Sequence, residues 1–316
     1  MPEKIRFASE NDLKRIAKEM AGEVISGRKF MIRYIRIVLL VVATALIATI
    51  LFSYFAPVLY GQFTQTVGWT TILTFIAVGF AAQMIDGSLG MAYGISCSSF
   101  LMSTGVSPEL ASASVHVAEV FTTSSSGFFH WKLGNFDKKL FRRIAIPGVI
   151  GAAAGAYVLS NFDGKVMQPY ISGYLILMGI VLIQKSFRPI RIWKFKRPAI
   201  LAGFGGFMDA SGGGGWGPIV STTLMAGGNH PAKTIGTVNA TEFFVAFAAG
   251  GVFSIFVGIQ SIEIVVGLII GGMLAAPLGA IFANKINKRY AMILVGVLII
   301  LLSTRTILIT TGILGK

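Results

Sequence analysis

Apolar runs of about 20 residues recur along nearly the whole chain, separated by short polar segments. A run of about that length, wound as an α-helix, crosses the hydrocarbon core of a bilayer. The pattern therefore predicts an all-α, polytopic membrane protein embedded in the lipid bilayer. The first long run, residues 37–60, predicts an extra N-terminal transmembrane helix. It follows a polar and basic head, residues 1–36, which is longer than the charged start of a cleavable signal peptide.

The basic head has an amphipathic pattern of its own. After Ser9, a favoured type of helix N-cap, apolar residues follow at three- and four-residue spacing. They are Leu13, Ile16, Met20 and Val24. A helix with this pattern would lie on the cytoplasmic membrane surface, with its basic residues toward anionic headgroups. A solvated head that only anchors the first helix explains the pattern equally well, so both interpretations stay open.

The chain repeats itself at a constant offset. Asp209 lies 209 − 86 = 123 residues after Asp86. The same offset relates further pairs of one residue type: Pro108 and Pro231, Glu119 and Glu242, Gly127 and Gly250, and Gly148 and Gly271. One register over so many positions predicts two homologous transmembrane halves, residues 69–187 and 198–314, joined by a basic linker, residues 188–197.

The distribution of basic residues predicts how these halves are oriented. Segments 132–143, 185–197 and 285–289 are basic, like the head, whereas the loops between them carry one lysine, Lys165. Basic loops stay in the cytoplasm, which places the N-terminus on the cytoplasmic side of the cell membrane. Corresponding loops of the two halves then fall on opposite sides. Such inverted repeats are typical of secondary transporters, whose substrate site lies near the membrane midplane.

Composition adds little to this picture. The 316 residues are 54% hydrophobic and 13% charged, and the formal net charge of +14 is explained by the cytoplasmic segments, so it does not indicate nucleic acid as a partner. The single cysteine, Cys97, leaves no intrachain disulfide. No phosphate-binding Gly-x-x-x-x-Gly-Lys-Ser/Thr loop is present. We expect a transporter that is neither ATP-driven by this chain alone nor an enzyme, and that uses no cofactor.

Two glycine-rich stretches interrupt apolar segments at membrane depth: "DGSLGMAYG", residues 86–94, and "DASGGGGWGP", residues 209–218. Glycine costs a helix about 1 kcal/mol per position relative to alanine, so each segment reads as a broken or re-entrant helix. Backbone amides freed at the break, and the positive N-terminus of the next short helix, could bind an anion. Close helix packing is the competing explanation. The candidate binding residues are Asp86, Ser88, Gly90, Asp209, Ser211, Gly212, Gly213, Gly214 and Gly215.

A second pair of corresponding stretches, "SVHVAEVF" and "TVNATEFF", adds polar residues to two predicted helices that begin with proline. His116 and Glu119 are three residues apart and share a helix face, as do Asn239 and Glu242. Ionisable residues inside a membrane are expensive, and desolvation favours the neutral form of a carboxyl group. We therefore expect His116 and Asn239 to contact substrate. Glu119 and Glu242 either carry protons or only brace the glycine loops.

The segments "MIDGSLGMAYG", "SPELASASVHVAEVFTTSSSG" and "MDASGGGGWGPIVST" with "VNATEFF" resemble the TauE/SafE-type sulfite exporter family of membrane permeases. The resemblance covers residues 69–312. It implies transport of sulfite, sulfoacetate or another small sulfur-containing anion across the cytoplasmic membrane, usually as export. It also places the family's glycine loops on residues 86–94 and 209–217, and its helix-borne acids on Glu119 and Glu242. The first loop contains fewer glycines than the family pattern, and the basic head is not part of that pattern.

Three functions remain under consideration. The first is a secondary transporter of a small sulfur oxyanion, with protons as a possible coupling ion. The second is a transporter of divalent metals or other cations, with oxygen and nitrogen ligands from intramembrane side chains. Those side chains are Asp86, His116, Glu119, Asp209 and Glu242. The third is an intramembrane aspartyl protease, in which Asp86 and Asp209 would share a proton. Helix capping explains these aspartates as well.

Overall fold

The computed structural model describes residues 68–187, 197–258, 261–283 and 287–313. The basic head and the predicted helix over residues 37–60 lie outside the described residues, as does nearly all of the predicted linker. In the described part, helix is the only regular secondary structure, so the predicted all-α class is confirmed. Six of its helices are long and apolar enough to cross a membrane, which agrees with a polytopic membrane protein.

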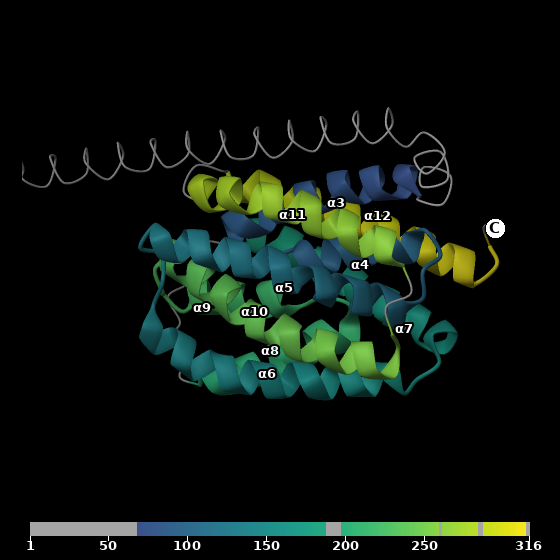
Figure 1. Ribbon diagram of the computed structural model, residues 1–316, viewed down its shortest axis with the longest axis horizontal. Helices are drawn as coiled ribbons and strands as arrows, with labels where there is room; N and C mark the ends of the chain where they lie inside the picture. The colour runs from purple at the N-terminus through teal and green to yellow at the C-terminus, as the bar shows by residue number, and fades with distance from the viewer. Residues whose placement is uncertain (1–67, 188–196, 259–260, 284–286, 314–316) are drawn as a thin grey trace, which may run out of the picture. The chain divides into compact units, whose positions relative to one another are not determined.

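The helices fall into two consecutive groups (Figure 1). The first group is α3 (Trp69–Leu89), α4 (Tyr93–Ser103), α5 (Pro108–Lys132), α6 (Lys138–Ser160) and α7 (Gly164–Phe187). The second is α8 (Pro198–Gly212), the π-helix η1 (Gly217–Ser221), which continues as α9 (Thr222–Ala226), α10 (Pro231–Phe256), α11 (Ile262–Phe282) and α12 (Lys288–Thr310).

The starts of several helices follow from local sequence. Pro108, Pro198 and Pro231 occupy the first turns of α5, α8 and α10, where proline removes no helical hydrogen bond. Asp137 caps α6 by accepting hydrogen bonds from two backbone N–H groups, and Asn287 caps α12 by accepting one from Arg289. The predicted proline-led starts of α5 and α10 are therefore confirmed.

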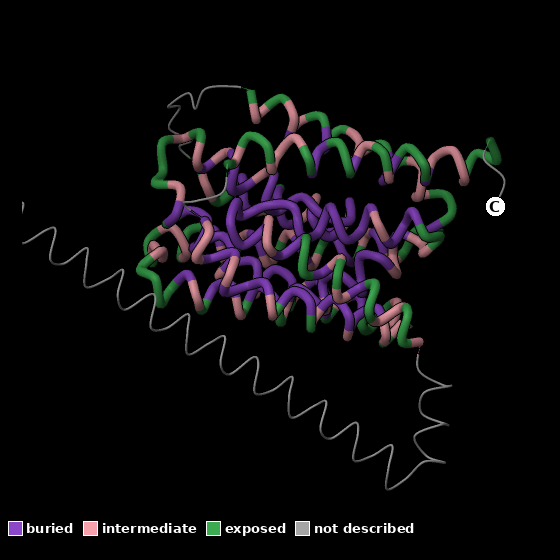
Figure 2. Tube along the Cα trace, turned by 90° about the horizontal axis from the view of Figure 1, so that it is seen from above, coloured by how far each residue is buried: buried purple, intermediate pink, exposed green. Residues whose placement is uncertain are grey.

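Buried residues gather in the middle of the described helices, and exposed residues lie on the outer ones (Figure 2). The exposed positions include many large apolar side chains, such as Ile146 and Leu301. In water such a surface would be unfavourable, whereas in a bilayer it faces lipid. The interior combines large apolar side chains, such as Trp216 and Phe253, with small residues and buried polar ones. Apolar side chains therefore occur both inside and on the outer surface, as expected of a multi-pass membrane protein.

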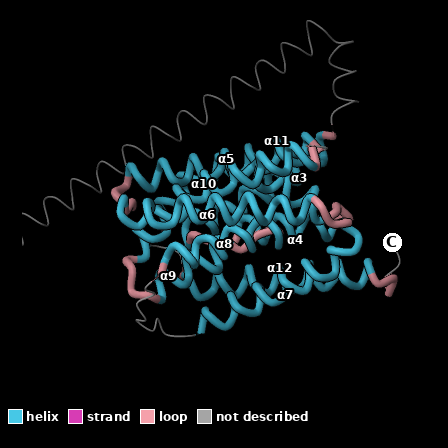
Figure 3. The backbone as a smooth tube through the Cα atoms, turned by 90° about the horizontal axis from the view of Figure 1, so that it is seen from below, coloured by secondary structure: helices cyan, strands magenta, loops and turns pink. Residues whose placement is uncertain are grey.

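The helices pack in four main pairs, and glycine permits the closest crossings. Helices α3 and α11 run parallel, as do α6 and α8, while α5 with α10 and α7 with α12 run antiparallel. Figure 3 shows α7 and α12 side by side. At the crossing of α6 and α8, a Cβ atom on Gly151 would lie 2.0 Å from the carbonyl oxygen of Gly203. No residue larger than glycine fits there without moving a helix.

Both glycine-rich segments are broken helices that turn back. The residue that follows α3, Gly90, has φ +68°, and the residue that follows α8, Gly213, has φ +74°, backbone conformations that favour glycine. After the first break, the ring of Phe100 on α4 lies 5.8 Å from that of Phe75 on α3. Helix α4 therefore returns along α3, so the first glycine-rich segment is a broken helix that forms a hairpin.

Candidate functional site

The two breaks meet each other in the interior. A Cβ atom on Gly214 would lie 2.3 Å from the backbone nitrogen of Ile95 and 2.7 Å from the carbonyl carbon of Gly94. A Cβ on Gly217 would lie 2.3 Å from the Cα atom of Met91. The breaks thus touch backbone to backbone, and glycine is required because any side chain would hold them apart. This contact brings together the starts of the two short helices, α4 and η1.

Asp209 organises the second break. Its side-chain Oδ1 accepts hydrogen bonds from the backbone N–H groups of Gly215 at 2.8 Å and Trp216 at 2.9 Å. Its backbone oxygen accepts from Gly213 and from Gly214. Four consecutive backbone donors of the break are therefore bound by one residue. Asp209 therefore acts as the cap of the short helix that follows. Helix capping is the alternative to a catalytic or substrate-binding role for this residue.

Asp86 has a similar place in the first break. Its backbone oxygen accepts from Gly90 at 2.6 Å, and the backbone of Tyr93, the first residue of α4, hydrogen-bonds to its carboxyl group. The other carboxyl oxygen, Oδ2, is buried and has no hydrogen-bond partner. The two corresponding aspartates therefore both bind the start of the short helix that follows them.

His116 and Glu119 on α5 face the second break. The Nδ1 atom of His116 lies 2.8 Å from the carbonyl oxygen of Ser112, so it donates there, and Nε2 lies 3.3 Å from Oδ2 of Asp209. A protonated ring would form an ion pair with Asp209. Glu119 lies one turn further on, and both of its carboxyl oxygens are buried without a hydrogen-bond partner. Its Oε1 would lie 3.0 Å from a Cβ on Gly94.

Asn239 and Glu242 lie on the crossing helix α10. The side-chain amide of Asn239 donates to the hydroxyl of Ser126 on α5 at 2.8 Å, so its hydrogen bond joins two helices, and its Oδ1 has no partner. Glu242 is buried, with Oε2 lacking a partner. The correspondence between His116 and Asn239 in sequence therefore does not extend to their contacts, since only His116 touches a break residue.

Several predicted site residues serve the breaks themselves. The hydroxyl groups of Ser88 and Ser211 donate to backbone oxygens of their own helices, at 2.9 and 2.7 Å. Gly212 and Gly215 pack against the ring of Tyr174 on α7, whose hydroxyl donates to the carbonyl oxygen of Gly214 at 3.1 Å. Tyr174 was not identified from sequence because nothing in its local pattern marks it.

The centre of the site is strongly acidic. Asp86, Glu119, Asp209 and Glu242 are all buried, and within the described ranges no lysine or arginine forms an ion pair with them. Among the described residues, the one basic partner of these carboxyl groups is His116. One ligand atom each from His116, Glu119 and Asp209 lies within 4.8 Å of the other two, close enough for a cation to be bound between them. Such a cluster of carboxyl groups favours positive charge, and an anion placed there would need positive charge to accompany it.

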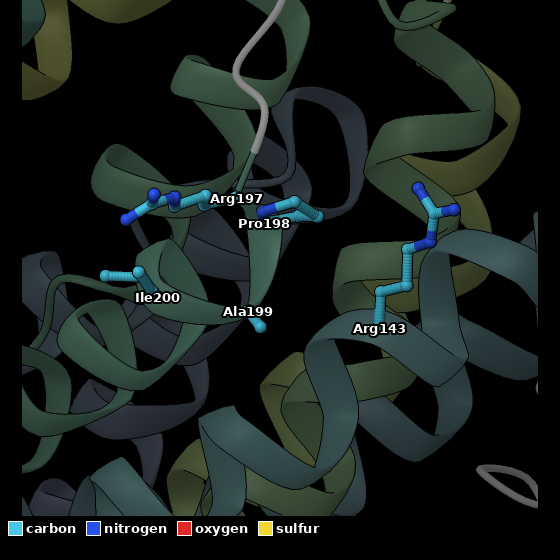
Figure 4. Close-up of a pocket in the computed structure, with 5 residues that line it drawn as sticks. All are labelled: Arg143, Arg197, Pro198, Ala199 and Ile200. Carbon is cyan, nitrogen blue, oxygen red and sulfur yellow. The ribbon is translucent and has the colours of Figure 1, made fainter.

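A separate surface cleft lies at the start of α8, the end of this helix opposite Asp209. It has a volume of about 450 Å³ and is lined by Arg143 on α6 and by Arg197 to Ile200 at the start of α8 (Figure 4). Asp209 is near the end of the same helix. This cleft is therefore distinct from the buried centre. Its two arginines belong to two of the basic segments of the sequence.

Comparison with known proteins agrees with this architecture. The model of the family described as sulfite exporter TauE/SafE matches residues 73–306. The chain is also 42% identical over 248 residues to YtnM, a probable membrane transporter protein of Bacillus subtilis (strain 168), and the match covers 75% of this chain and 83% of YtnM. No solved structure matches the chain. With these matches and the six apolar helices of spanning length among the described residues, the class is a multi-pass membrane transporter. Within that class, the chain belongs to the sulfite exporter TauE/SafE family.

Proposed function

We propose that this protein is a secondary transporter, and not an enzyme, that exports a small sulfur-containing oxyanion, such as sulfite or an organosulfonate, across the cell membrane. The observation that carries the proposal is the meeting of two re-entrant breaks at a buried polar centre, in a chain of this family. Short helices that begin at membrane depth direct their positive ends at that centre, which suits an anionic substrate.

The proposed mechanism is alternating access by two inverted halves. Two of the helix pairs that join the halves support this proposal: α5 and α10 correspond in sequence and run antiparallel, as do α7 and α12. An element and its counterpart run in opposite directions when a repeat is inverted. Rocking one half against the other would then expose the centre first to one side and then to the other, with the N-terminus in the cytoplasm.

Charge sets the conditions for substrate binding at this centre. Unpaired carboxyl groups repel an anion, so we propose that Glu119 and Glu242 are protonated when the anion binds. Anion and protons would then move together, and export would follow the combined gradient of both. The carboxyl group of Asp209 must also release the backbone N–H groups of Gly215 and Trp216 before these can donate hydrogen bonds to an anion. His116 provides a second partner for its carboxyl group, at 3.3 Å. Asp86 would release the backbone of the first break, at Tyr93, in the corresponding way.

The test is anion flux in proteoliposomes, with sulfite, thiosulfate, sulfate and a sulfonate measured with and without an imposed pH gradient. Saturable flux of a sulfur anion that the gradient drives, and that Glu119→Gln or Glu242→Gln uncouples, is the expected result. Flux that ignores both the gradient and the variants would keep the anion proposal and leave the glutamates a bracing role. If no sulfur anion moves, the proposal fails.

A divalent-cation transporter is the second candidate, and the clustering of His116, Glu119 and Asp209 favours it. An imidazole nitrogen with two carboxylates suits a divalent ion such as Zn²⁺ or Mn²⁺. The same proteoliposomes decide between the two functions. Metal uptake that is lost in His116→Ala and unaffected by sulfur anions would support the second candidate over the first.

A further inference from the structure

Two basic side chains outside the acidic centre bind the short helices that begin there. Lys185, on α7 of the first half, donates from Nζ to the carbonyl oxygen of Pro218 at 3.1 Å and to the hydroxyl of Thr222. Arg305, on α12 of the second half, donates from Nη1 to the carbonyl oxygen of Ser103. Each basic residue therefore joins the last helix of one half to the short helix of the other half.

The two contacts lie at opposite ends of the paired helices α7 and α12. On these helices Gly179 packs against Ile300, and Ile183 packs against Gly296, so residue numbers rise along one helix as they fall along the other. Lys185 is near the end of α7 and Arg305 is near the end of α12. Because the helices are antiparallel, the two basic residues lie at opposite ends of this helix pair.

Arg305 is unusual in its own helix. It interrupts the apolar run "ILVGVLIILLSTRTILIT", where a charged side chain is costly unless it finds a polar partner. It finds one at Ser103, the last residue of α4, because the final carbonyl groups of a helix lack intrahelical donors and attract cations. The hydroxyls of Ser99 and Ser303 lie 3.5 Å apart in the same interface. Polar contacts thus hold α4 to α12 within otherwise apolar surroundings.

Lys185 meets a correspondingly irregular segment. Thr222 follows the π-helix η1, a form that is rare and often occurs at functional sites. The hydroxyl of Thr222 donates to the carbonyl oxygen of Pro218, and Lys185 binds both atoms. One ammonium group therefore ties the first half to the start of the second short helix. Charged donors form the stronger class of hydrogen bond, so releasing such a contact requires a compensating gain elsewhere.

We propose that Lys185 and Arg305 are two latches, each holding the short helix at its own face of the bundle, and that each releases its helix when that face opens. This rests on the alternating-access function proposed above, though not on the identity of the substrate. With one latch at each face, loss of either side chain favours opening at its own face only. A residue that merely stabilises the fold would loosen the bundle without such sidedness.

Distances between pairs of spin labels test the latches directly. Because Cys97 is the only cysteine, a Cys97→Ser background accepts new labels at chosen positions. One pair, at Thr104 and Thr304, spans the Arg305 contact, and the other, at Gln184 and Asn229, spans the Lys185 contact; all four positions are exposed. Each pair is measured by pulsed electron resonance with the latches intact and with Lys185→Met or Arg305→Met.

We expect Arg305→Met to increase the longer-distance population of the first pair by about tenfold and leave the second unchanged, and Lys185→Met to do the reverse. Lys165→Met, an exposed lysine at the start of α7, is the matched control and should change neither pair. Lys185→Arg keeps a charged donor and should retain the intact distances. Equal changes in both pairs, or no change in either, would overturn the proposal. Sided opening without sulfur-anion flux would keep the latches and reject the substrate.

Discussion

At the scale of single residues, Asp209 combines two roles that substitution can separate. One carboxyl oxygen caps the break through Gly215 and Trp216, and the other faces His116. An asparagine keeps an oxygen acceptor for the two amides and loses the negative charge. An alanine loses both. The residue therefore connects the stability of the break with the electrostatics of the centre.

We predict that Asp209→Ala lowers the stability of the protein by about 1–2 kcal/mol, the usual cost of losing an N-cap, and that Asp209→Asn lowers it much less. Thermal unfolding of the purified protein in detergent, followed by size-exclusion fluorescence, measures both. The Ser211→Ala variant is the control, since its hydroxyl bonds only within its own helix. Equal destabilisation by Asn and Ala would show that the negative charge, and not the cap, dominates.

Gly214 illustrates backbone constraint at the same scale. Its φ of +132° is outside the range that residues with a side chain readily adopt, and a Cβ there would overlap Ile95. We predict that Gly214→Ala destabilises the protein by about 2 kcal/mol or more, whereas Gly173→Ala, a helical position with open space around it, is tolerated. Thermal unfolding checks this pair. A stable, monodisperse Gly214→Ala protein would contradict the close meeting of the breaks.

At the scale of elements, the sequence predicted which segments break but not what the breaks bind. Glycine and aspartate in an apolar run are a local signal, and the broken helices lie where that signal placed them. The pairing of His116 with Asp209 joins residues 93 positions apart and depends on how α5 packs against α8. The same holds for Tyr174 and Lys185, whose partners are in the other half. Charge within an apolar run could have identified Arg305.

The crossing of α5 and α10 gives a prediction at this scale. A Cβ on Gly127 would lie 2.9 Å from the Cα atom of Ala240, so the crossing depends on glycine. We predict that Gly127→Leu forces the helices apart and costs about 1–3 kcal/mol, measured by thermal unfolding. Gly251→Leu is the matched control, because its position on α10 is exposed with nothing within 4 Å. If both variants unfold at the same temperature, the crossing tolerates a larger separation than the structure implies.

At the scale of the whole molecule, the last prediction concerns the orientation of the two halves. Lys138 corresponds to Ser261, since 261 − 138 = 123, and both lie at the start of a helix, α6 and α11. If the halves are inverted, a cysteine at Lys138 reacts with a membrane-impermeant thiol reagent only from the cytoplasmic side. A cysteine at Ser261 then reacts only from the outside. Both are placed in the Cys97→Ser background and assayed in intact cells and in inverted vesicles. Labelling of both positions from one side would mean that the halves share one orientation. The antiparallel packing of the corresponding helices α5 and α10 would then need an explanation other than an inverted repeat.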